Sequence, residues 1–105
     1  MALPKVDIPE EKLQDFCARW NVLELALFGS VLRDDFSPLS DVDVLVPFQK
    51  DVHWGLADFV SMVDELGDIF GHKVDLIERR AIERSENYIR RRHILSTAEP
   101  VYVAG

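Results

Sequence analysis

Short apolar runs alternate with helix-forming segments along this chain of 105 residues, and that alternation limits the folds it can adopt. Apolar residues spaced three and four apart predict amphipathic helices over residues 10–20 and 56–70, the second ending at Gly71. A less regular helix is expected over 88–95, and a short helical turn over 30–35. The predicted strands are residues 22–28, 41–46, 74–78 and 101–103. We therefore predict an α/β (α+β) fold with a small mixed β-sheet backed by helices.

The length of the chain suits one domain, which we place at residues 1–105. A separate substrate-binding domain does not fit, so a second wall of any site must come from another chain, either a copy of this one or a different protein. Cys17 is the only cysteine, which excludes an internal disulfide and favours a reducing compartment. The sequence has no signal-peptide core and no run of membrane-spanning length, so we expect a cytoplasmic protein without a membrane partner.

The formal net charge of −7 argues against nucleic acid as a direct partner, because binding to phosphates needs a basic surface. The charge is uneven along the chain. Residues 1–71 carry 5 basic and 14 acidic side chains, whereas residues 72–105 carry 7 basic and 5 acidic ones. Either the two parts face different partners or the charge is simply dispersed over the surface.

Most of the candidate catalytic and ligand-binding residues lie in the segment FGSVLRDDFSPLSDVDVLV. Gly29 and Ser30 stand where a strand turns, and glycine there permits close approach of the backbone to an anion. Asp41 and Asp43 follow the tenth residue after Ser30, and positions two apart on a strand share a face. Paired carboxylates repel each other unless a cation lies between them, and Mg²⁺ prefers such oxygen ligands together with phosphates. The segment therefore predicts a site for a nucleoside triphosphate and magnesium.

A third carboxylate on a neighbouring strand would complete such a site, and Asp75 is the best candidate. It is the one acid inside this strand, flanked by the apolar Val74 and Leu76. Its expected role is to bind metal and to accept the proton of an incoming hydroxyl group.

The pattern of Gly-Ser, ten residues, Asp-x-Asp and a later strand aspartate resembles the nucleotidyltransferase superfamily related to DNA polymerase beta. With FGSVLRDDF and SDVDVLV intact in so short a chain, the sequence is similar to minimal nucleotidyltransferase (MNT) domains, in particular the MntA-like antitoxins of HEPN/MNT toxin–antitoxin systems. The likeness extends over most of the chain, from about residue 25 to residue 103. It implies the nucleotidyltransferase fold.

This resemblance also implies a role for each matching residue. Gly29 and Ser30 would hold the triphosphate of ATP, Asp41 and Asp43 would bind two Mg²⁺ ions, and Asp75 would bind one of them and help deprotonate the acceptor. The implied reaction transfers AMP from ATP to a tyrosine of a partner HEPN-domain RNase toxin, which inactivates the toxin.

Alternatives remain open for single residues and for the whole chain. Arg33 lies one helical turn beyond Ser30, where it reaches either the phosphates or a nearby acid, Asp34 or Asp41. The arginines at 79, 80, 84 and 90–92 are expected on a solvated face, with contact to nucleotide or partner as the second interpretation. The alternative function is a non-catalytic antitoxin or regulatory subunit that blocks its partner by direct binding.

Overall fold

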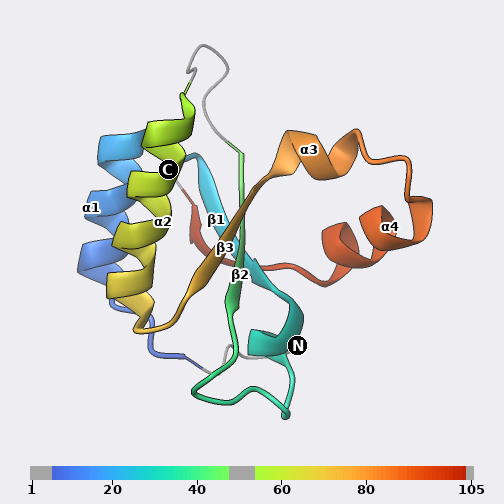
Figure 1. Ribbon diagram of the computed structural model, residues 1–105, viewed down its shortest axis with the longest axis horizontal. Helices are drawn as coiled ribbons and strands as arrows, with labels where there is room; N and C mark the ends of the chain where they lie inside the picture. The colour runs from blue at the N-terminus through green and yellow to red at the C-terminus, as the bar shows by residue number, and fades with distance from the viewer. Residues whose placement is uncertain (1–5, 48–53, 104–105) are drawn as a thin grey trace.

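The computed structural model describes residues 6–47 and 54–103, which form a four-stranded sheet between two pairs of helices (Figure 1). The elements in chain order are α1 (Glu10–Trp20), β1 (Glu24–Phe28), the 3-10 helix η1 (Gly29–Leu32), β2 (Val42–Val46), α2 (Leu56–Phe70), β3 (Val74–Glu78), α3 (Arg79–Glu83), α4 (Tyr88–Thr97) and β4 (Glu99–Val103). The strand order is β3-β2-β1-β4. The sheet is mixed, because β1 pairs antiparallel with β2 and β4 while β2 and β3 run parallel. The predicted fold class is therefore confirmed.

One face of the sheet carries the main hydrophobic core, under α1 and α2 (Figure 1). Helix α1 contributes Leu13, Phe16 and Cys17, whose spacing places them on one side of the helix. Helix α2 contributes residues at four-residue intervals, and β2 contributes alternate valines that are fully buried. The buried residues from these two elements are Met62, Leu66, Phe70, Val42, Val44 and Val46.

The opposite face of the sheet is covered only in part, by α3 and α4. A smaller group of buried residues, here called the second core, joins these helices to the sheet. Because side chains alternate along a strand, Asp43 faces the same side as Leu45 and points away from the main core. The second core consists of Ala26, Phe28, Leu45, Ile82 and Ile94.

Several boundaries differ from the predicted ones for local reasons. The first strand begins at Glu24 and not at residue 22, because the Val22 amide donates to the Cys17 carbonyl at 2.9 Å and closes the end of α1. The predicted helical turn over residues 30–35 is shorter and ends at Leu32, since Arg33 is extended. Strand β2 begins at Val42, so Asp41 lies immediately before it.

The C-terminal part of the chain also differs in detail. Helix α3 was not predicted, because five residues with a single buried side chain, Ile82, give no helical periodicity to read. Helix α4 runs to Thr97 and β4 begins at Glu99, both longer than expected. The predicted α2, with Gly71 in the left-handed conformation at its end (φ 70°), is confirmed. Within the described residues, no helix is both long and apolar enough to cross a membrane.

Candidate active site

The turn that follows β1 is shaped around Gly29, which has a φ of +77°. Phe28 pairs with Asp43 across the antiparallel strands β1 and β2, so the Asp43 side chain comes close to the turn. A Cβ atom at Gly29 would overlap the Asp43 Oδ2 atom and lie 3.3 Å from its Cγ atom. Both the backbone conformation and the missing side chain of glycine are needed here.

Ser30 connects this turn to the segment that carries the first acid. Its hydroxyl group donates a hydrogen bond to the Asp41 carbonyl oxygen at 3.4 Å. The Arg33 amide donates to the Ser30 carbonyl at 2.9 Å, which closes η1 directly after the turn. The Gly29–Ser30 corner and the start of β2 are thus held side by side, as the spacing of the motif predicts.

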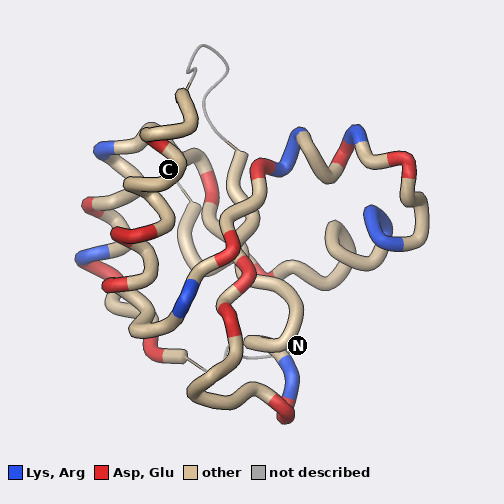
Figure 2. Tube along the Cα trace, viewed as in Figure 1, with Lys and Arg blue, Asp and Glu red and all other residues tan. Residues whose placement is uncertain are grey.

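Three aspartates occupy neighbouring positions beside this corner, and we call Asp41, Asp43 and Asp75 the acidic row. Asp43 and Asp75 are partners in the parallel register of β2 and β3, and Asp41 stands two residues before Asp43. Figure 2 shows acidic segments of these strands next to each other near the middle of the molecule. Asp43 is half-buried, whereas Asp41 and Asp75 are exposed to solvent. The structure therefore brings together the three acids that the sequence singled out.

The electrostatics of Asp43 reflect this crowding. Burial raises the pKa of the Asp43 carboxyl group, and the negative charges of Asp75 and Asp41 raise it further. The positive charges of Arg33 and Arg90 oppose this shift without cancelling it. Asp43 thus stands partly buried beside two further carboxylates, a setting that a bound cation would stabilise.

The residues present fit magnesium bound jointly by protein and nucleotide. Within the described part of the chain, no group of three or more His, Cys, Asp or Glu side chains is arranged to hold a metal by itself. Mg²⁺ in phosphate-transfer sites takes one or two carboxylates and completes its shell with water and substrate phosphates. The neighbouring Asp43 and Asp75 carboxylates, with the raised pKa of Asp43, match that mode of binding.

Arg33 lies beside the acidic row. Its ion pair in the structure is with Asp35, whereas the sequence suggested Asp34 or Asp41. Its Nε atom donates to the Asp35 Oδ1 atom at 3.1 Å, and both side chains are exposed. The pair lies at the surface, so it holds Arg33 only weakly. The positive charge of Arg33 nevertheless opposes the rise in the pKa of Asp43.

His72 was not assigned to the site from the sequence, and Arg90 was expected on a solvated face, with contact to nucleotide or partner as the second interpretation. His72 contacts the Ser40 carbonyl through Nδ1 at 3.1 Å and lies against the Phe36 ring, with 4.9 Å between ring centroids, so it supports the loop before Asp41. Arg90, on α4, acts electrostatically on Asp43. Its signal in the sequence was the spacing of four residues to the apolar Ile94, which the run of three arginines obscured.

Comparison with known proteins places this site in context. The model of the family described as nucleotidyltransferase domain matches residues 10–97. Over 64 residues the chain is 33% identical to a protein of Methanocaldococcus jannaschii named as a putative protein adenylyltransferase, a match that covers 61% of this chain and 64% of the relative. Over 65 residues it is 32% identical to the protein adenylyltransferase MntA of Thermococcus cleftensis, covering 62% of this chain and 64% of that protein. The chain thus spans less than two thirds of the length of these relatives.

A solved structure supports the assignment of the fold. The chain superposes on a crystal structure of a toxin–antitoxin with AMP-PNP with a TM-score of 0.67, covering 91% of this chain and 74% of the other. The sequence identity is 16%, so this likeness concerns the fold.

Proposed function

The chain belongs to the nucleotidyltransferase domain family, and from that premise we propose that it is a magnesium-dependent protein adenylyltransferase that acts as an antitoxin. The proposed reaction transfers AMP from ATP to a tyrosine hydroxyl group of a partner HEPN-domain toxin and inactivates that toxin. Relatives named as protein adenylyltransferases and the fold shared with a toxin–antitoxin structure support the proposal. A cytoplasmic location accords with the single free cysteine.

The observation that carries the proposal is the fit of Gly29 against Asp43 with Asp75 in register beside it. Gly29 leaves room for the Asp43 side chain, but the fold does not require a charged, half-buried group at that position. A more stable chain would place an apolar or uncharged side chain at this position. A bound ligand that needs the acid gives it a role that the fold alone does not.

The reaction assigns a task to each residue around the corner. Gly29 and Ser30 contact the triphosphate, and Arg33 adds positive charge beside it. The acceptor hydroxyl oxygen forms a bond to the α-phosphorus while the bond from that phosphorus to the pyrophosphate oxygen breaks. Asp75, exposed at the edge of the site, accepts the hydroxyl proton. Bound magnesium, two ions in our proposal, supplies neutralisation of phosphate charge and orientation of the nucleotide.

The acceptor comes from outside the chain in this proposal. The acidic row lies on the sheet face that α3 and α4 cover only in part, and Asp41 and Asp75 are exposed there. A partner protein can therefore approach the acids directly. The open site also separates the proposal from its alternative, an antitoxin that blocks its partner by contact alone, because contact alone gives no role to three neighbouring carboxylates.

The test combines the purified chain with ATP, Mg²⁺ and the protein encoded by the adjacent gene. Intact mass spectrometry should show the partner gaining adenylyl groups, and peptide mapping should place them on tyrosine. Asp43→Asn should slow this transfer by at least about 100-fold, because it removes a carboxylate that would hold magnesium at the reacting phosphate.

The matched control is Asp64→Asn, since Asp64 is an exposed aspartate on α2, on the other side of the sheet. This variant should transfer AMP at the wild-type rate. If the partner is inhibited while its mass stays unchanged, the adenylyltransferase proposal is wrong and the chain is an antitoxin that acts by contact alone. A partner modified equally by wild type and Asp43→Asn would remove the acidic row from the mechanism.

A further inference from the structure

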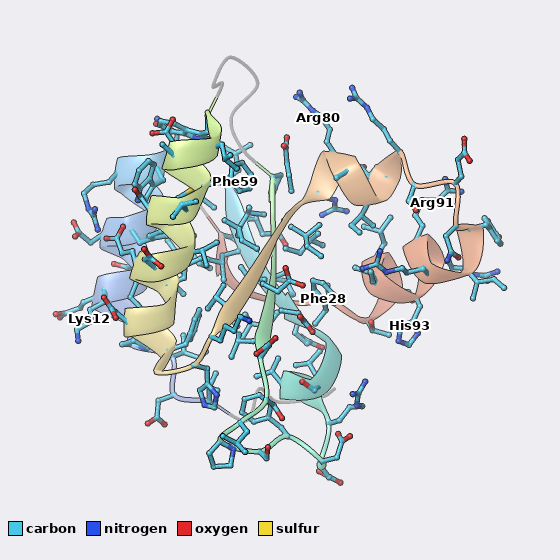
Figure 3. All side chains as sticks on the ribbon, in the orientation of Figure 1. Lys12, Phe28, Phe59, Arg80, Arg91 and His93 are labelled. Carbon is cyan, nitrogen blue, oxygen red and sulfur yellow. The ribbon has the colours of Figure 1, made fainter. Side chains whose placement is uncertain are left out.

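Arg90 occupies a defined place on the helix that faces the site. It lies four residues before Ile94, so the two side chains share one face of α4. Ile94 is buried in the second core together with Phe28, and Phe28 is the strand partner of Asp43. Figure 3 shows Phe28 between the sheet and α4. Arg90 is therefore one helical turn beyond the second core, on the side of α4 that faces the sheet.

The two arginines that follow Arg90 are held by their own helix and the turn before it. Arg91 donates from Nη1 to the Ser85 carbonyl at 3.1 Å, and its guanidinium lies 5.5 Å from the centre of the Tyr88 ring. Arg92 donates from Nη1 to the Tyr88 hydroxyl at 3.4 Å. Both contacts stabilise the first turns of α4 and occupy these guanidinium groups.

The Arg90 guanidinium differs, because within residues 6–47 and 54–103 it has neither a hydrogen bond nor an ion pair. The backbone at Arg90 is nevertheless fixed, since its amide donates to the Asn87 Oδ1 atom that caps α4, at 3.1 Å. An ordered backbone carrying an unengaged guanidinium is suited to binding an external anion, because Arg presents a planar fork of donors to phosphate oxygens.

Arg90 and Arg33 come from two different elements that both pack near Asp43. Arg33 directly follows η1, the turn beside Asp43, and Arg90 lies on α4, whose Ile94 packs with Phe28, the strand partner of Asp43. These two elements are far apart in the sequence. A triphosphate placed against the acidic row would repel the carboxylates and would need positive charge on its other sides.

We propose that Arg90 is a phosphate-binding residue of the nucleotide site, contacting the triphosphate from α4 while Arg33 contacts it from η1. This inference rests on the proposed function and adds to it a wall of the site that α4 supplies. It also separates the three adjacent arginines, since Arg90 binds ligand while Arg91 and Arg92 stabilise the helix.

The test measures binding, not transfer, by titrating AMP-PNP with Mg²⁺ and, separately, inorganic tripolyphosphate into wild type, Arg90→Gln and Arg92→Gln. Arg90→Gln should weaken both probes about tenfold, the usual effect of losing one charge-assisted hydrogen bond to phosphate. Its affinity for adenosine should be unchanged. Arg92→Gln is the matched control, because it removes the same charge two residues away and should alter either affinity by less than about twofold.

The outcomes separate this inference from the proposed function. Equal losses in Arg90→Gln and Arg92→Gln would assign the effect to overall charge and overturn the role of Arg90. Wild-type affinity in Arg90→Gln would overturn it too, while leaving the adenylyltransferase proposal in place. Absence of AMP-PNP binding to wild type would overturn both. Far-ultraviolet circular dichroism confirms that each variant keeps α4 before its affinity is compared.

Discussion

Gly29 leaves the space that the Asp43 carboxylate occupies. The two residues are next to each other because Phe28 and Asp43 are paired in the β1–β2 register, and a Cβ atom at Gly29 would lie 3.3 Å from the Asp43 Cγ atom and closer still to Oδ2. The turn and the acid are therefore one structural unit. The effects of substitutions at these two residues on stability should therefore depend on each other.

Gly29→Ala should destabilise the protein by about 3 kcal/mol, since it combines left-handed backbone strain with steric overlap. Gly71→Ala is the matched control, because Gly71 also has a positive φ but a Cβ atom there would meet no atom within 4 Å. It should cost only the backbone strain, about 1 kcal/mol. Urea denaturation measures both. In an Asp43→Ala background the excess cost of Gly29→Ala should disappear, and if it persists the overlap is not its cause.

Asp43→Asn should raise the stability of the metal-free protein at neutral pH. Burial and the charges of Asp75 and Asp41 raise the pKa of Asp43 above its value in the unfolded chain. The folded state therefore binds the proton more tightly, and the contribution of Asp43 to stability is lost as the pH rises through the folded-state pKa. The variant should have the higher urea midpoint at neutral pH, and the difference should shrink in acid. A lower midpoint at neutral pH would show that the carboxylate is already compensated.

Magnesium should stabilise the wild-type protein in the presence of AMP-PNP more than either ligand does alone. The reason is that the acidic row supplies only part of a coordination shell and the phosphates complete it. A thermal-denaturation series measures the effect as an upward shift of the midpoint. Asp75→Asn should lose most of that shift, whereas Asp64→Asn should keep it. A shift that survives in Asp75→Asn would place the metal elsewhere.

Cys17 should be unreactive in the folded protein and reactive once it unfolds. Burial in the main core raises the pKa of its thiol to about 12, so almost no thiolate forms at mildly alkaline pH. Labelling with a chromogenic disulfide reagent should be slow in buffer and rapid in urea, with a midpoint that coincides with unfolding. Rapid labelling in buffer would mean that α1 opens without the rest of the fold.

Glu65→Gln should destabilise the protein at neutral pH and have little effect in acid, the reverse of Asp43→Asn. Burial favours the neutral form of Glu65, but hydrogen bonds from Arg19 and Trp20 and the Arg19 charge outweigh it and lower its pKa. Its contribution is therefore present at neutral pH and lost as the pH falls through the folded-state pKa. Asp64→Asn, one residue away and on the same helix, provides the baseline for urea midpoints across the pH range. If the urea midpoints of the two variants change with pH in parallel, the contacts of Glu65 with Arg19 and Trp20 contribute nothing to the stability of the protein.

The main elements were predictable because local spacing encodes them. The helices α1 and α2 follow from apolar residues at three- and four-residue intervals, and β3 from a short, mostly apolar run that encloses Asp75. The Gly29–Ser30 corner and the Asp41–Asp43 pair were also readable, since each lies within a few residues of sequence. Helix α3 and the first residues of β4 were missed, because their burial comes from contact with the sheet and not from a repeating pattern.

The sequence by itself determined which residues can do chemistry and on which local elements they lie. Only the tertiary structure decided which of them meet. Asp75 stands beside Asp43 because β3 pairs parallel with β2, and Arg90 acts on the acidic row because Ile94 anchors α4 on that face of the sheet. The physical reason is that strand order, register and helix packing depend on burying distant apolar surfaces together, and no spacing within a short segment records that choice.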